Sequence, residues 1–236
     1  VGEGFRPGRG CQTALSVVDE ALHFGYKWVV DADITKFFDN VNHGLVLSQL
    51  NEEIADGSVL RLVEAFLKGG VMMDGGEVEP TELGTPQGGP LSPLLANVYL
   101  HPFDVAMQEA GFGVVRYADD FVIFTQSRER AGEALVLAEE TLAQLKLNLH
   151  PEKTRVVSID EGFEFLGYRY VRDRKARVQK VVGEKAMRRF RDHIRQLTPR
   201  CGGRPDSYGC GPAGRLDRVG HGLADAHDRP LRWSGC

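Results

Sequence analysis

The sequence predicts a fold in which helices and β-strands follow one another along most of the chain. Segments with apolar residues at helical spacing alternate with short, nearly continuous apolar runs that are typical of buried strands. Hydrophobic residues make up 42% of the 236 residues, so the chain can bury a sizeable core in one or two domains.

The first expected elements are a helix, a strand and a second helix. Residues 12–24 carry apolar side chains at helical spacing, and Gly25 follows as a residue that ends helices. Residues 27–34 (KWVVDADI) form a nearly continuous apolar run and are predicted as a strand. Asn42 can cap a helix that extends to Leu50.

A third helix and a hairpin are predicted next. Residues 58–67 are expected to form a helix, with Ser58 at its start and the glycines at 69–70 at its end. Residues 71–81 contain Asp-Gly-Gly at 74–76, a turn sequence that predicts a β-hairpin. A loop rich in Gly and Pro then covers residues 84–90.

A long helix and two strands are expected after this loop. Residues 91–110 form the helix, in which Pro93 is tolerated because it lies in the first turn. Residues 114–125 are apolar on both sides of the turn at 118–120, which predicts a strand, a tight turn and a second strand. The remaining expected elements are a helix, two strands and a basic helix, at residues 128–147, 155–158, 163–171 and 183–197.

The composition changes after Pro199. Residues 201–236 are dense in Gly, Arg, Asp, His and Pro and lack a periodic apolar face, so we expect an irregular tail that is either disordered or the product of a shifted reading frame. The four cysteines contain no CxxC pair, which favours reduced thiols at Cys11, Cys201, Cys210 and Cys236. The alternative is a zinc site made by the last three with His221 and His227, although their spacing matches no common site.

The net charge of −4 is the sum of two unlike parts. Positions 1–160 carry 12 Lys+Arg and 24 Asp+Glu, whereas positions 161–236 carry 17 Lys+Arg and 9 Asp+Glu. An acidic body followed by a basic segment is compatible with a metal-binding core beside a segment that contacts phosphates. A solvated charged surface is the alternative explanation.

No membrane or export segment is expected. The sequence has no run of eighteen apolar residues, so nothing in it is predicted to span a bilayer. Residues 1–4 lack both an initiator Met and the basic-then-apolar leader of an exported protein. We therefore expect a cytoplasmic protein whose true amino terminus lies upstream of Val1.

Three aspartates are the strongest candidates for chemistry. Asp33 ends an apolar strand, and Asp119 and Asp120 lie at a predicted hairpin turn that begins 86 residues later. Carboxylates at a strand end and a neighbouring turn can hold two Mg²⁺ ions and so promote phosphoryl transfer. Ordinary turn chemistry is the alternative for an isolated Asp, and the spacing alone does not exclude it.

The segments around these aspartates decide between the two explanations. Six blocks resemble, in order, those of reverse transcriptases in their group II intron form: GFRPGR (4–9), DITKFFDNVNH (33–43), GTPQGGPLSPLLAN (84–97), YADD (117–120), LNLHPEKT (147–154) and FLGY (165–168). The resemblance covers roughly residues 4–171. One block is a moderate signal, whereas six in the family's order are a strong one.

The resemblance implies an α+β fold, the palm of a right-hand polymerase, in which an antiparallel sheet is backed by helices. Partial fingers and the palm are expected over residues 1–171, the start of a truncated thumb or maturase region over 172–199, and the irregular tail over 200–236. The family's fingers normally begin well before Gly4, and no endonuclease motif follows the thumb segment.

The implied function is that of an RNA-directed DNA polymerase that extends a primer by two-metal phosphoryl transfer, with a role in intron splicing and mobility. The implied partners are an RNA template, taken to be intron RNA, a DNA primer and deoxynucleoside triphosphates. Two Mg²⁺ ions are the implied cofactors, and Mn²⁺ can substitute for them. The alternative is a non-catalytic RNA-binding maturase or an inactive truncated remnant.

Roles at the metal site follow from the resemblance residue by residue. It implies that Asp33 and Asp119 bind both ions, that Asp120 is an auxiliary acid, and that the backbone carbonyl of Ile34 completes one metal site. Lys153 matches the family's candidate proton donor to pyrophosphate. An exposed structural lysine is an equally supported role for Lys153.

Roles around the nucleotide follow in the same way. Phe38 matches the aromatic residue that excludes a ribose 2′-hydroxyl, and Phe37 is expected in the core because alternation turns it to the other face. The implied contacts to the template base and incoming nucleotide are Gln87, Gly88 and Gly89. Contacts to nucleic acid are expected from Arg6 and Arg9, for which a solvated loop is the alternative, and from the basic helix that contains Arg188 and Arg189.

Overall fold

The computed structural model describes residues 2–69, 71–72, 78–79, 83–85, 89–173 and 177–198. The chain divides into two compact units, Val1–Ile194 and Arg195–Cys236, and of the second unit only residues 195–198 are described. The predicted irregular tail therefore lies outside the described residues. The fold below is that of the first unit.

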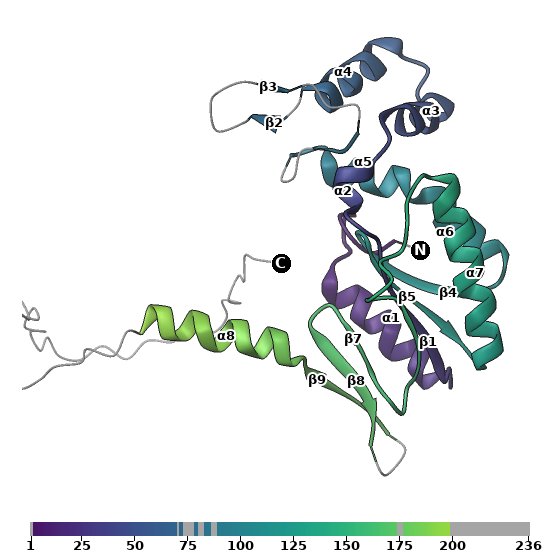
Figure 1. Cartoon of the computed structure of the whole chain (residues 1–236), viewed down its shortest axis with the longest axis vertical. Helices are drawn as coiled ribbons and strands as arrows, with labels where there is room; N and C mark the ends of the chain where they lie inside the picture. Colours follow the sequence, from purple (N-terminus) through teal and green to yellow (C-terminus); the bar gives the residue numbers. More distant parts are fainter. Residues whose placement is uncertain are drawn as a thin grey trace, which may run out of the picture. The chain divides into compact units, whose positions relative to one another are not determined.

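A four-stranded antiparallel sheet forms its centre, in the order β4-β5-β1-β6 (Figure 1). The strands are β1 (Trp28–Asp33), β4 (Gly113–Tyr117), β5 (Asp120–Thr125) and β6 (Arg155–Ser158). The two central strands, β1 and β5, are built from the two apolar runs that carry the candidate aspartates at their ends.

Three helices cover one face of this sheet: α5 (Ser92–Tyr99), α6 (His101–Glu109) and α7 (Arg128–Gln144). Alternate strand residues, among them Val30 and Ile123, are fully buried against them. The rings of Phe103 and Phe121 lie 4.9 Å apart in this core. Burial of apolar side chains in such a core is the main stabilising contribution to a domain.

The opposite face is covered by α1 (Cys11–His23) and a three-stranded antiparallel sheet of β7 (Phe163–Phe165), β8 (Tyr168–Arg172) and β9 (Val178–Val182). Phe124 of β5 packs on Phe163, and Phe163 stacks on Tyr170 at 5.1 Å. The strand residues on this face alternate with those of the other core. Asp31 and Asp33 belong to the same row as Val29 and so lie on this second face.

The segment between β1 and α5 is mainly helical. It contains α2 (Phe37–Asn40), α3 (His43–Glu53), α4 (Gly57–Lys68), β2 (Val71–Met72) and β3 (Val78–Glu79). The predicted cap of α3 is confirmed, because the Asn42 side chain accepts a hydrogen bond from the Leu45 amide at 3.1 Å. α4 is capped by Asp56, two residues before the predicted start at Ser58. β2 and β3 pair in antiparallel orientation, as the predicted hairpin requires, whereas its turn at 74–76 lies outside the described residues.

The predicted basic helix is α8 (Glu184–Leu197), and none of its residues is buried. No helix among the described residues is long and apolar enough to cross a membrane.

The single helix predicted over residues 91–110 is wrong, because the structure has two helices, α5 and α6, that meet at Leu100. Pro102 explains the break. It has no amide hydrogen to donate to the carbonyl of Val98, and its ring would clash with that carbonyl in a continuous helix. Pro102 instead occupies the first turn of α6, where its missing donor carries no cost.

The single strand predicted over residues 163–171 is also wrong, because β7 and β8 form a hairpin there. The turn consists of Leu166 and Gly167, which both have positive φ, 48° and 80°. Two residues of positive φ match the twist of tight hairpins, and the Leu-Gly pair was too weak a turn signal to reveal it. Neither β9 nor α2 was predicted.

Candidate active site

The candidate aspartates meet at one end of the central sheet. Asp33 is the last residue of β1 and lies directly opposite Asp120, the first residue of β5. Asp119 occupies the turn between β4 and β5, next to Ala118, whose φ is +58°. Cross-strand partners project from the same face of a sheet, so the Asp33 and Asp120 side chains share one surface.

Burial and mutual repulsion both raise pKa values in this group of carboxylates. Burial, and then the negative charges of the neighbouring aspartates, raise the pKa of Asp120 to about 7. Burial also raises the pKa of Asp119, with the charge of Asp33 as a smaller cause. Partly buried carboxylates repel one another unless a cation lies between them, so this end of the sheet is suited to a divalent ion.

The aspartate carboxylates suit a Mg²⁺ site that is completed by water and substrate oxygen atoms. Within the described part of the chain, no group of three or more His, Cys, Asp and Glu side chains is arranged to hold a metal ion without further donors. Mg²⁺ is commonly held by one or two carboxylates together with water and substrate phosphates, and does not need a closed protein cage. The aspartates fit such a shared site, in which a nucleotide would supply the remaining oxygen atoms.

Lys153 is carried to this site by the loop that follows α7. The amide of His150 donates to the Asp33 carbonyl at 2.8 Å, and the amide of Thr35 donates to the Asn148 carbonyl at 2.9 Å. These bonds fasten the loop to the end of β1, where the Lys153 ammonium forms an ion pair with the Asp33 carboxylate. The hydrogen bond to Asp33 raises the pKa of Lys153, so the lysine is fully protonated at neutral pH.

Ile34 continues β1 beyond the sheet. It forms an isolated bridge with Leu149, and its side chain is buried in the core beneath α5 and α7. Its backbone therefore runs beside the carboxylates between two fixed segments. The role of the Ile34 backbone carbonyl as a metal ligand remains a prediction.

A fourth aspartate on the same surface was not predicted. Asp31 lies two residues before Asp33 and opposite Arg155 of β6, whose guanidinium donates two hydrogen bonds to it at 2.8 and 3.0 Å. Burial raises the pKa of Asp31 despite this partner. The alternation of a strand places Asp31 and Asp33 on one face and could have indicated the residue, whereas its partner depends on the strand order.

Phe37 lies in the core as predicted, whereas the role of Phe38 in excluding ribose remains a prediction. Phe37 is fully buried, whereas Phe38 is half-buried at the edge of the same core. Their rings lie 5.1 Å apart in an edge-to-face arrangement. The strand alternation from which Phe37 was placed in the core is wrong, because Phe37 and Phe38 belong to the short helix α2.

The start of the glycine-rich block is fastened to this helix. The amide of Thr85 donates to the Phe38 carbonyl, and that of Gly84 donates to the Val41 carbonyl, both at 2.8 Å. The His43 imidazole Nε2 lies 2.6 Å from the Gly84 carbonyl oxygen in a buried contact. The structure thus joins the blocks that begin at Asp33 and Gly84. Gln87 and Gly88 lie outside the described residues, and Gly89 lies just before α5.

The predicted arginines have local partners or lie at the surface. Arg9 forms an ion pair with Glu3, and Arg6 donates to the Gly2 carbonyl at 3.3 Å. Arg188 and Arg189 are exposed on α8. Contacts of these four residues with nucleic acid remain predictions. Cys11 has a free thiol, whereas the cysteines of the alternative zinc site lie outside the described residues.

An antiparallel sheet backed by helices, with aspartates at the end of β1 and at the β4–β5 turn, defines the palm of a right-hand nucleic acid polymerase. The family model described as reverse transcriptase (RNA-dependent DNA polymerase) matches residues 3–170. The chain belongs to the reverse transcriptase family.

Curated relatives agree with the predicted group II intron form. The chain is 43% identical over 104 residues to the group II intron-encoded protein LtrA of Lactococcus lactis subsp. cremoris, a match that covers 44% of the chain and 17% of LtrA. It is 28% identical over 232 residues to protein YkfC of Escherichia coli, covering 79% of the chain and 60% of YkfC. The prediction of a group II intron-type reverse transcriptase is confirmed, for a chain that spans less than two thirds of either relative.

A solved structure supports the fold. The telomerase from Candida albicans, solved with the TWJ fragment of telomeric RNA, matches with a TM-score of 0.58 over 84% of this chain and 39% of that one. At 14% identity the likeness concerns the fold alone, and it agrees with the predicted palm.

Proposed function

We propose that this chain is the catalytic core of an RNA-directed DNA polymerase of the group II intron type. Its substrates are a primer 3′-hydroxyl and a deoxynucleoside triphosphate, and its template is RNA, with intron RNA as the natural one. The single observation that carries the proposal is the position of Asp33 opposite Asp120, with Asp119 in the adjoining turn.

The metal site of this proposal consists of Asp33 and Asp119, with Asp120 beside them and the carbonyl of Ile34 as a further oxygen donor. Two Mg²⁺ ions held there would supply activation of the attacking hydroxyl and stabilisation of the leaving oxygen, and Mn²⁺ could supply the same. The aspartates hold and orient this charge at the end of β1, where the α-phosphate of the nucleotide would lie. The bond from the 3′-oxygen to phosphorus forms as the bond to pyrophosphate breaks.

Lys153 is proposed to donate a proton to the departing pyrophosphate. Its ammonium already contacts Asp33, is exposed, and is kept protonated by that carboxylate. General acid catalysis requires a proton donor within hydrogen-bond reach of the leaving group. The docked loop of residues 147–154 keeps the lysine within such reach of the site.

Phe38 is proposed to select deoxyribose. Its ring is half-buried against Phe37, and its backbone carbonyl is bonded to Thr85 at the start of the nucleotide block. A ring that packs on Phe37, on a backbone fixed by Thr85, would clash with a 2′-hydroxyl at this position, which makes exclusion of ribose a steric effect.

A primer-extension assay on an RNA template tests the proposal. Since the chain spans 17% of LtrA, the assay compares the 236-residue chain with the same chain joined to the segments that flank the corresponding region of LtrA. The joined protein is expected to extend the primer in Mg²⁺. The chain alone is expected to extend it weakly, because residues 1–160 carry twice as many acidic as basic residues and repel the duplex.

Matched variants of the joined protein identify the site. Asp119→Asn keeps the size of the side chain but removes its charge, and it is expected to abolish extension. Asp160→Asn is the control, because Asp160 is an exposed aspartate paired with Arg172 in a remote turn. Extension that survives Asp119→Asn would overturn the proposed catalytic role.

A splicing cofactor is the second candidate function. The exposed basic helix α8 favours it, since a helix rich in arginine suits contact with RNA phosphates independently of polymerisation. A joined protein that binds intron RNA and supports its splicing, yet extends no primer, would favour this second candidate.

A further inference from the structure

A buried arginine lies directly behind the metal-binding turn. Arg116 is the penultimate residue of β4, is 1% exposed, and faces the helices and not the aspartates. Its Nε and Nη2 atoms donate to the two carboxylate oxygens of Asp104 on α6. This two-point contact fixes the plane of the guanidinium, which a single hydrogen bond would leave free to rotate.

The third nitrogen of Arg116 reaches the turn. Its Nη1 atom donates to the carbonyl of Ala118 at 2.9 Å and to Asn97 Oδ1 at 3.3 Å. Ala118 immediately precedes Asp119 and has a φ of +58°, a conformation that costs energy for any residue with a side chain. The hydrogen bond from Arg116 holds the peptide that joins Ala118 to Asp119.

The amino-terminal segment supports the same turn from another side. Asn97 Nδ2 donates to the Gly4 carbonyl at 2.9 Å, and the Glu3 amide donates to the Arg116 carbonyl at 2.7 Å. A Cβ atom added to Gly4 would lie 2.7 Å from the amide nitrogen of Ala118, a distance that forces the backbone to shift. The turn is therefore confined between Gly4 and the guanidinium.

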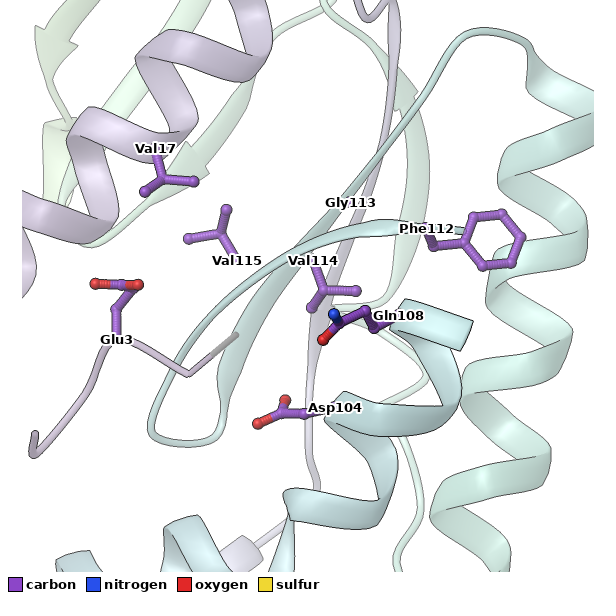
Figure 2. A pocket seen from close by; sticks show the side chains of 8 residues that line it. All are labelled: Glu3, Val17, Asp104, Gln108, Phe112, Gly113, Val114 and Val115. Carbon is purple, nitrogen blue, oxygen red and sulfur yellow. The ribbon is translucent and has the colours of Figure 1, made fainter. Parts of the chain in front are cut away.

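A pocket of about 240 Å³ adjoins this network and is lined by residues that include Glu3 and Asp104 (Figure 2). Glu3 is paired with Arg9 and Asp104 with Arg116, so both carboxylates are balanced within the protein. Water that enters the pocket can solvate a polar group left without its partner. Substitutions in the network therefore need not leave a charge in a dry core.

We propose that Arg116 is a positioning residue for the metal site, held by Asp104 and acting through the Ala118 carbonyl to direct the Asp119 carboxylate. The inference rests on the proposed function, because it concerns the same site. Buried ion pairs contribute little net stability on average, so a role in geometry accounts for this pair better than stability does. Lysine cannot replace arginine here, since it has no planar fork to span Asp104 and the Ala118 carbonyl together.

Terbium luminescence tests this inference without polymerase activity. Tb³⁺ occupies oxygen-rich cation sites, and Tyr117, the cross-strand neighbour of Asp120, can sensitise its emission. The 236-residue chain and its variants are titrated with Tb³⁺ and then with competing Mg²⁺. Arg116→Lys is expected to weaken Tb³⁺ and Mg²⁺ binding by about tenfold or more, as loss of a group that orients a metal ligand does.

The control separates positioning from stability. Leu142→Ala removes a buried side chain of α7 that takes no part in the network, so it lowers the thermal midpoint but is expected to leave Tb³⁺ affinity unchanged. Gly4→Ala leaves Arg116 and Asp104 intact and displaces the turn from the other side, so it is expected to weaken binding as Arg116→Lys does. It also provides the test if Arg116→Lys fails to fold.

The outcomes are distinguishable. The first two outcomes apply if Asp119→Asn has lost Tb³⁺ binding. In that case, wild-type Tb³⁺ affinity in folded Arg116→Lys overturns the inference. If Arg116→Lys does not fold, wild-type Tb³⁺ affinity in Gly4→Ala overturns it. Wild-type affinity in Asp119→Asn overturns the proposed metal site itself, and the inference with it. Loss of affinity in Leu142→Ala equal to that in Arg116→Lys reduces Arg116 to a structural role and also overturns the inference.

Discussion

At the scale of single residues, the site is formed by side chains that are distant in sequence. The sequence predicted that Asp33 and the Asp119–Asp120 pair act together, and the register of β1 and β5 agrees, because Asp33 lies opposite Asp120. The partners Arg155 and Arg116 were not predicted. Periodicity shows which face a residue occupies but not which strand or helix packs beside it, so ion pairs between elements stay hidden.

Sugar selection gives a prediction at this scale. In the joined polymerase, Phe38→Ala is expected to raise ribonucleotide incorporation about tenfold or more, because the loss of the ring removes the clash with the 2′-hydroxyl. Deoxynucleotide incorporation should remain largely intact. Phe66→Ala is the control, since Phe66 is another half-buried phenylalanine of the same core, on α4. If Phe38→Ala and Phe66→Ala preferred deoxynucleotides over ribonucleotides to the same degree, Phe38 would have only a packing role.

At the scale of elements, apolar patterns and helix-capping residues were sufficient to find both central strands and the helices α1, α3, α4, α7 and α8. They were insufficient where turn chemistry interrupted a continuous pattern. Pro102 divides residues 92–109 into two helices, and Leu166 adopts a positive φ that its side chain gives no reason to expect. The palm topology came from the family resemblance, because strand order depends on contacts between distant segments.

The docking of the glycine-rich block onto α2 gives the second prediction. Gly84 has a φ of +86°, and an added Cβ would lie 3.0 Å from the carbonyl oxygens of Phe38 and Asp39. Gly84→Ala is expected to cost more than the ~1–2 kcal/mol of the left-handed conformation alone. Gly111→Ala is the matched control, because Gly111 has a φ of +76° but open space around its Cα. Chemical denaturation measures both free energies of unfolding, and equal losses would show that the close approach at Gly84 is unimportant.

At the scale of the whole molecule, charge is distributed unevenly. Residues 1–160 carry 12 basic and 24 acidic side chains, whereas α8 alone contains five of the 29 Lys+Arg residues. An acidic surface concentrates cations near the aspartates but repels nucleic acid, so the proposed binding of RNA is expected to depend mainly on basic segments such as α8.

RNA affinity gives the third prediction. Replacement of four arginines of α8 by glutamine, at Arg188, Arg189, Arg191 and Arg195, is expected to lower RNA affinity and to flatten its dependence on salt by the loss of up to four phosphate contacts. Fluorescence anisotropy at several salt concentrations measures both quantities. The control neutralises four exposed basic residues elsewhere, at Arg61, Lys68, Arg128 and Lys146. The same salt dependence in both variants would contradict a special role for α8.

The central claim is that Asp33 and Asp119 bind the catalytic cations together. Anomalous X-ray diffraction from crystals grown with Mn²⁺ and a deoxynucleoside triphosphate tests it most directly, because Mn²⁺ replaces Mg²⁺ and is located independently of its ligands. The account predicts anomalous density between the Asp33 and Asp119 carboxylates, beside the nucleotide phosphates. Mn²⁺ bound to the nucleotide alone, with Asp33 still paired to Lys153 and Asp119 turned away, would contradict it.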